Sequence, residues 1–111
     1  IHKVALKPGV DAQAFERFAI DTFAPIYHQY EPRQTAYLLK GDRGEAAGQY
    51  ALLIEIESVE ARNDIYPVEG EISERLQQAI AETAALWAEL DTFVNRFPDP
   101  GASDYVVMGG G

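Results

Sequence analysis

Residues 34–57 read QTAYLLKGDRGEAAGQYALLIEIE, and they decide how the rest of the chain is arranged. Residues 34–40 have the composition of a β-strand, and the polar, glycine-rich residues 41–48 are typical of a hairpin loop. Residues 50–57 predict the returning strand. Because side chains alternate along a strand, one of its faces carries Tyr50, Leu52, Ile54 and Ile56. The stretch therefore predicts a β-hairpin at the centre of the fold.

A strand and a helix are expected before the hairpin. Residues 2–7 alternate as a strand does, and Pro8-Gly9 ends the run. Asp11 is a suitable N-cap for the helix that follows. Pro25 lies within the helical pattern, so we expect a kink or a local break there. The apolar stripe of this helix consists of Phe15, Phe18, Ala19, Thr22, Phe23, Ile26, Tyr27 and Tyr30.

Two helices and a last strand are expected after the hairpin. Ser58 is the predicted N-cap of a short helix over 59–65, and Ser73 that of a long helix from 74 to about 95. Residues 104–108 read as a final strand, and 109–111 as a glycine tail. The order strand, helix, strand, strand, helix, strand is the split βαβ arrangement. We therefore predict one α+β domain over residues 1–108, a ferredoxin-like βαββαβ fold with a four-stranded antiparallel sheet and helices on one face.

Composition excludes several functions. The 111 residues hold 9 Lys and Arg against 18 Asp and Glu, for a net charge of −9, and no cysteine. This charge argues against nucleic-acid and anionic-membrane partners, which bind concentrated basic patches. Without cysteine there are no disulfides or thiolate metal sites, and with two histidines no three-histidine zinc site. No metal is therefore expected, and the lack of cysteine suits a cytoplasmic location.

Two stretches carry a family resemblance. Residues 1–11, IHKVALKPGVD, and residues 54–62, IEIESVEAR, resemble the stress-responsive dimeric α/β-barrel domains and the antibiotic-biosynthesis-monooxygenase-like domains. The resemblance implies a homodimer whose two sheets pack face to face, and a small-molecule pocket between helices and sheet. It also implies a range of activities, among them cofactor-free monooxygenases, polyketide cyclases and haem-handling enzymes.

The chain departs from the cyclase-like members after the short helix. Those members carry His-Pro-x-His there, whereas this chain reads Tyr66-Pro67-Val68-Glu69, so that the proline is kept and both histidines are absent. Proton transfer at this place would need Glu69 as the base and Tyr66 as the hydrogen-bond donor. His2 is the other candidate acid or base, because the resemblance and its strand face put it at the edge of the pocket. A structural histidine bonded to backbone or water is the alternative.

Aromatic residues provide the candidate ligand-binding set. We expect Phe23, Tyr27, Tyr50 and Trp87 to face an interior pocket for an apolar or aromatic ligand, with Tyr66 or Tyr50 steadying a developing oxyanion in an enzyme. Ordinary core packing is the alternative. No cofactor is expected, although His28 could serve as a single axial ligand in a haem-binding protein.

The opposite sheet face is expected to pair with a second copy. It would carry Lys3, Lys7, Glu55 and Glu57, in cross-strand ion pairs or around a charged ligand. Pairing Leu38 with Leu52 would place Tyr37 on this face, and a slip of one residue would move Tyr37 to the helix side. The expected function is a homodimer that binds a small apolar or aromatic molecule, as a cofactor-free monooxygenase or cyclase-like enzyme. A non-catalytic dimeric scaffold and a haem-binding protein are the alternatives.

Overall fold

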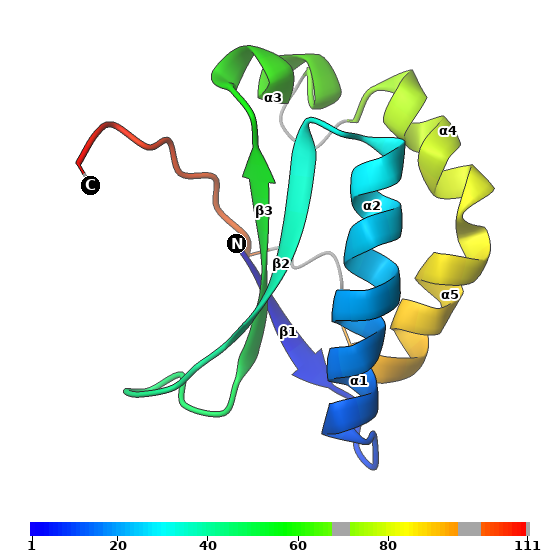
Figure 1. Ribbon diagram of the computed structural model, residues 1–111, viewed down its shortest axis with the longest axis vertical. Coiled ribbons are helices and arrows are strands. Elements are labelled where there is room, and N and C mark those ends of the chain that lie inside the picture. The colour runs from blue at the N-terminus through cyan, green and yellow to red at the C-terminus, as the bar shows by residue number, and fades with distance from the viewer. Residues whose placement is uncertain (68–71, 96–100, 111) are drawn as a thin grey trace.

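A computed structural model describes residues 1–67, 72–95 and 101–110. Its four strands form an antiparallel sheet in the order β2-β3-β1-β4. The helices α1, α2, α4 and α5 cover one face of the sheet (Figure 1). The predicted α+β class and ferredoxin-like element order are therefore confirmed.

The hairpin takes the register that places Tyr37 away from the helices. Strand β2 (Gln34–Lys40) pairs with β3 (Tyr50–Ile56), and Leu38 lies opposite Leu52. Leu52 is buried under the helices, whereas Tyr37 is 45% exposed on the other face. Because side chains alternate along a strand, Leu39 lies on the same face as Tyr37 and is also exposed. Its partner in the register is Ala51.

The fourth strand is not where the sequence pattern placed it. Strand β1 (His2–Leu6) pairs with β3 on one side and with β4 (Val94–Asn95) on the other, where Leu6 lies opposite Val94. The prediction of a strand over 104–108 is wrong, because these residues have no strand assignment and lie largely exposed. Val94 is buried where it pairs with β1, so residues 94–95, and not 104–108, form the edge strand.

The first helical run changes to a π-helical turn just before its proline, where the sequence predicted a kink or a local break. It consists of α1 (Ala12–Phe18), the π-helical turn η1 (Ala19–Phe23) and α2 (Ala24–Tyr30). The side chain of Asp11 accepts a hydrogen bond from the Gln13 amide and caps α1. Pro25 has no amide to donate and its ring would crowd the preceding turn, so a locally wider helix accommodates it.

The second helical run is broken, which corrects the prediction of one helix over 74–95. After α3 (Val59–Ile65), the chain forms α4 (Glu74–Glu82) and α5 (Ala84–Phe93), separated at Thr83. The Thr83 hydroxyl donates to the carbonyl of Ala79 at 2.7 Å, a bond within its own helix of the kind that bends helices. The predicted caps Ser58 and Ser73 are confirmed, because each side chain accepts an amide hydrogen bond.

The buried residues form a main core and a smaller group. The main core lies between the sheet and the helices α1, α2 and α5, around the fully buried Phe15 and Phe23. The smaller group lies on α3 and α4, outside the main core, and consists of Ala61, Ile65, Leu76 and Ala79. The division leaves a narrow space between α2 and the α4–α5 pair.

Candidate functional site

A small cavity lies between α2 and the α4–α5 pair. Its volume is about 20 Å³, room for roughly one water molecule. Its walls are almost entirely apolar. They are formed by Ile26, Tyr27, Tyr30, Leu76, Ala79, Ile80, Thr83, Leu86 and Trp87.

Three of the predicted ligand-binding aromatics meet at this cavity. Phe23 stacks on Tyr27 with ring centroids 5.6 Å apart, and it also contacts Trp87 edge-on at 5.5 Å. Tyr27 and Trp87 are 6.4 Å apart and both line the cavity. Phe23 is fully buried and supports them from behind.

The indole of Trp87 is held in place by the helix break. Its Nε1–H donates to the Thr83 hydroxyl at 3.1 Å, while that hydroxyl donates onward to Ala79. Thr83, the residue at the helix break, therefore also orients the largest aromatic group of the cavity wall.

A buried polar cluster adjoins Tyr27. The Nε2 of Gln34, at the start of β2, donates to the Tyr66 hydroxyl at 3.0 Å. Burial raises the pKa of Tyr27, and the neighbouring Tyr66 hydroxyl raises it further. Gln34 is completely buried, and its Oε1 accepts no hydrogen bond from any described residue. A buried carbonyl oxygen without a partner costs about 1–3 kcal/mol, so a partner at this position would stabilise the fold.

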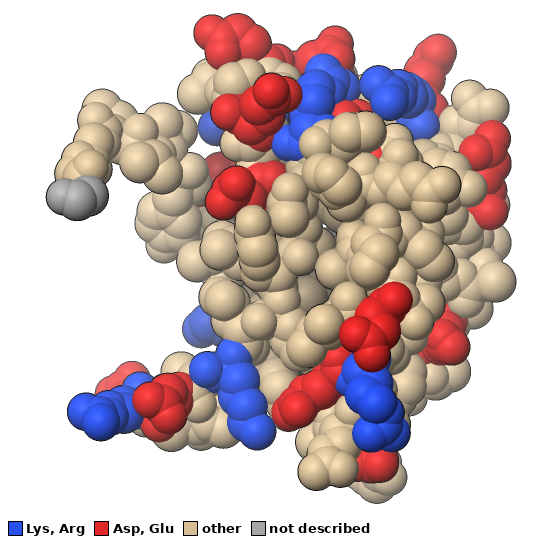
Figure 2. Space-filling view, viewed as in Figure 1, with Lys and Arg blue, Asp and Glu red and all other residues tan. Residues whose placement is uncertain are grey.

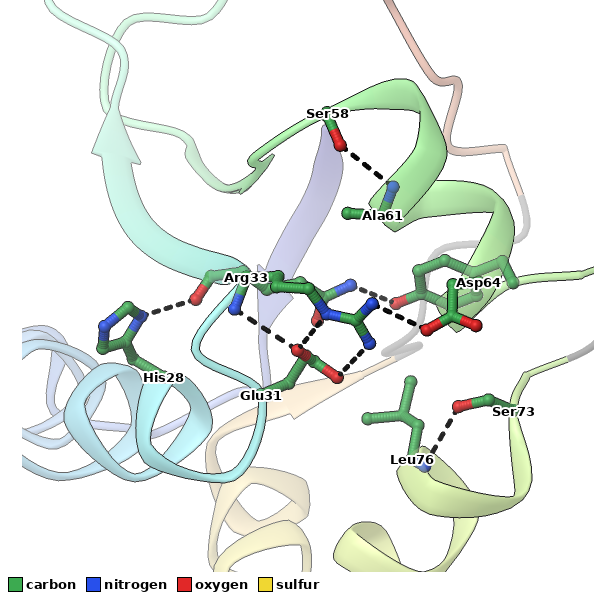
Figure 3. Close-up of polar contacts among 10 residues, drawn as sticks. His28, Glu31, Arg33, Ser58, Ala61, Asp64, Ser73 and Leu76 are labelled. Carbon is green, nitrogen blue, oxygen red and sulfur yellow. Dashed lines mark hydrogen bonds and ion pairs between the residues drawn. The ribbon is translucent and has the colours of Figure 1, made fainter.

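An ion-pair network closes the same end of the molecule, where α2 leads into β2. Arg33 binds Glu31 through Nε–Oε1 at 2.8 Å and Nη2–Oε2 at 3.1 Å, and reaches Asp64 of α3 at 2.7 Å (Figure 3). Glu31 is almost completely buried, and the hydrogen bonds from Arg33 hold the pKa of its carboxyl below the usual range. His28 lies in the same region, with its Nδ1 2.7 Å from the Gln34 carbonyl oxygen.

Tyr50 belongs to a different part of the structure. Its hydroxyl donates to Glu16 of α1, and its ring contacts Phe15 edge-on at 5.3 Å. The bond from Tyr50 lowers the pKa of Glu16 and raises that of Tyr50 itself. Tyr50 does not line the cavity, so the structure does not bring it together with Tyr27 and Trp87.

Two of the three predicted catalytic residues, His2 and Tyr66, lie in the part of the chain that the structure describes. Tyr66 lies in the polar cluster. His2 is half-buried on β1 opposite Leu52, and it does not line the cavity. Glu69 lies outside the described residues. No cluster of three His, Asp or Glu side chains able to hold a metal ion occurs in the described part of the chain.

Sequence analysis missed Gln34, Glu31 and Arg33. One signal was available for Gln34, because it shares a strand face with Ala36 and Leu38 and so had to be covered by the helices. The pairing of Glu31 with Arg33 had no such signal. It depends on the turn between α2 and β2, where the Arg33 amide also lies 3.3 Å from the Glu31 carboxylate.

Charged side chains lie mostly around the rim of this view of the molecule. Figure 2 shows a broad uncharged area in its middle, with acidic and basic groups gathered toward the two ends.

None of the helices in the described ranges is long and apolar enough to span a bilayer. Comparison of the chain with family models, curated proteins and solved structures finds no match.

Proposed function

We propose that this chain forms a homodimer of the dimeric α/β-barrel type, joined through the sheet faces that the helices leave open. Exposed apolar side chains on that face support the proposal. Tyr37 is 45% and Leu39 is 39% exposed, and Leu53 lies directly across from Tyr37. Pairing two such faces buries apolar area at about 25 cal/mol per Å².

In each subunit we further propose that the space between α2 and the α4–α5 pair receives a small apolar or aromatic molecule. The unpartnered Oε1 of Gln34 carries this proposal, because it leaves an acceptor free in the polar cluster that adjoins Tyr27. Gln34 and Tyr66 do not line the cavity at its present size, whereas Tyr27 does. A ligand with one hydroxyl group would suit apolar walls with a polar end. The break at Thr83 provides the joint about which α4 would swing outward to enlarge the present cavity.

The proposal concerns binding and names no reaction. Oxygenation or cyclisation would use Tyr66 as a donor and would need a base beside it. No His, Asp or Glu lines the cavity among the described residues. A non-catalytic dimeric scaffold is the second candidate. Two observations favour it. The Gln34 side-chain amide and the Tyr66 hydroxyl hydrogen-bond to each other rather than to a ligand, and the cavity has a volume of only about 20 Å³.

The single tryptophan offers a direct test of ligand binding. The indole N–H of Trp87 gives one resonance from the cavity wall, which can be followed during titration with p-cresol and with toluene, its analogue without the hydroxyl. Binding predicts that both compounds shift this resonance and that p-cresol binds more tightly. If neither shifts it at the solubility limit, the binding proposal is wrong and the scaffold is supported.

Two tyrosines of α2 form a matched pair for the polar end. Both line the cavity, but only Tyr27 adjoins Tyr66. Tyr27→Phe should reduce the preference for p-cresol over toluene, whereas Tyr30→Phe should leave it unchanged. An equal effect of the two substitutions would contradict a role of the polar cluster in binding the ligand hydroxyl.

The dimer is tested separately by sedimentation equilibrium. Tyr37→Asp places a charge on the open sheet face and should dissociate the dimer, because an unpaired charge is costly to bury. Ile20→Asp, at a residue 58% exposed on the helical layer, is the control and should leave the mass unchanged.

A further inference from the structure

We infer that residues 105–108 form an arm that packs on the open sheet face of a second copy of this chain. The inference rests on the proposed homodimer and adds to it a segment that each subunit gives to the other. The arm consists of Tyr105, Val106, Val107 and Met108.

The arm is apolar and uncovered in the single chain. Tyr105 is 79%, Val106 50%, Val107 92% and Met108 91% exposed. A scattered exposed apolar side chain is ordinary, but four consecutive ones form a patch of the kind that marks an interaction site. The residues have no strand assignment, so their backbone is not committed to the sheet of their own chain.

The base of the arm is attached to its own subunit. The Ile1 nitrogen donates to the Ser103 carbonyl at 3.3 Å, and Asp104 lies 4.0 Å from the Arg62 guanidinium. Beyond this point the segment runs away from the body on the side of the sheet opposite α1, α2, α4 and α5 (Figure 1). The arm therefore projects on the same side as the open face.

The open face of a second copy matches the arm in chemistry. It presents an apolar patch of Tyr37, Leu39 and Leu53, which are half-buried or exposed. The strand register places the charged Lys3 and Glu55 on the same face, beside this patch. The arm carries no charge, so packing it on this patch places no charged side chain of its own in a dry contact. In a two-fold dimer each arm covers the sheet face of the other subunit, so the same contact forms twice.

Removal of the arm separates its role from that of the sheet face. Sedimentation equilibrium and native mass spectrometry would compare the whole chain with a chain that ends at Ser103. Because each arm would bury large apolar side chains on its partner, loss of both arms should raise the dimer dissociation constant at least about tenfold. Val107→Asp should do the same in the intact chain, whereas Ile20→Asp should not.

The outcomes distinguish the two proposals. A whole chain that stays monomeric contradicts the dimer and the arm together. A dimer that is equally tight with and without residues 104–111 contradicts the arm and leaves the sheet-face dimer standing. The far-UV circular dichroism of the shortened chain verifies its fold, and Val107→Asp decides the question if that chain does not fold.

A second experiment locates the arm. Because the chain has no cysteine, Met108→Cys provides one attachment site for a spin label. In a mixture of spin-labelled ¹⁴N chains and unlabelled ¹⁵N chains, the amides of β2 and β3 around Tyr37 should broaden through contact between chains. Broadening confined to other elements, or none, would overturn the inference.

Discussion

Replacement of Arg33 by methionine tests how much its ion pair with Glu31, the most deeply buried charged residue in the described structure, contributes to stability. Glu31 has a side chain only 3% exposed, and the Arg33 guanidinium donates two hydrogen bonds to it, beside a longer one from the Arg33 backbone amide. The variant leaves this carboxylate buried without its partner. Removal of one partner from a fully buried pair costs about 3–5 kcal/mol, and because Arg33 is itself 27% exposed we expect about 2–3 kcal/mol at neutral pH.

The sign of the pH dependence follows from the pKa of Glu31. Arg33 lowers that pKa below its ordinary value of 4.5, so the stabilising contribution is complete above this value and is lost as the pH falls through the lowered pKa. In Arg33→Met the carboxyl loses the guanidinium that lowers its pKa most, and it keeps the weaker effects of the residue-33 amide and of Arg75. The difference in unfolding free energy between wild type and variant should therefore shrink as the pH is lowered from about 7 to about 3.

Urea unfolding followed by the fluorescence of Trp87 measures both quantities. Asp64→Asn is the control, because Asp64 is 71% exposed and its pair with Arg33 should contribute less than about 1 kcal/mol. A loss in Arg33→Met no larger than that of Asp64→Asn, or a loss independent of pH, would refute the reasoning.

Two further predictions concern the other parts of the fold. Tyr50→Phe removes the hydrogen bond that lowers the pKa of Glu16, so this pKa should rise toward its ordinary value in a carboxyl NMR titration, and an unchanged titration would contradict the assigned bond. Ile65→Ala deletes a fully buried side chain and should cost about 2–5 kcal/mol of unfolding free energy in urea. Val59→Ala on the same helix, at a residue 42% exposed, should change it by less than about 0.5 kcal/mol, and equal losses would argue against the burial of Ile65.

Local patterns were sufficient for most of the fold. Alternation located β1 and β3, composition located β2, and the caps Asp11, Ser58 and Ser73 marked the helix starts correctly. These features depend on neighbours in the sequence, so a sequence contains their evidence.

The edge strand could not be read in the same way. Val94 and Asn95 continue the helical stripe, and only their pairing with Leu6 and Ala5, almost ninety positions earlier, makes them a strand. Residues 104–108 have the stronger strand composition but lie exposed in the single chain. Composition therefore identified a segment suited to β-contacts without identifying its partner.

The candidate site was predictable only in its apolar part. The helical stripe brought Tyr27 and Phe23 together with Trp87, as expected from spacing. The polar part depends on Gln34 meeting Tyr66, a contact between the first residue of a strand and the end of a helix 32 positions later. Tyr50 lies in the interior, as expected, but it belongs to the main core, where its hydroxyl donates to Glu16 of α1, and it does not line the cavity.

The helix break at Thr83 has a consequence for how the molecule opens. Leu90 of α5 belongs to the main core, whereas Leu76 and Ala79 of α4 belong to the smaller buried group. Leu86, Trp87 and Phe93 of α5 also pack against the main core, to which the described residues of α4 do not belong. Two helices joined at a single non-helical residue need not unfold together, and the one with fewer contacts to the main core is expected to open at a lower free energy. Backbone amides of α4 should therefore exchange with deuterium sooner than those of α5, so the two helices would belong to separate cooperative units.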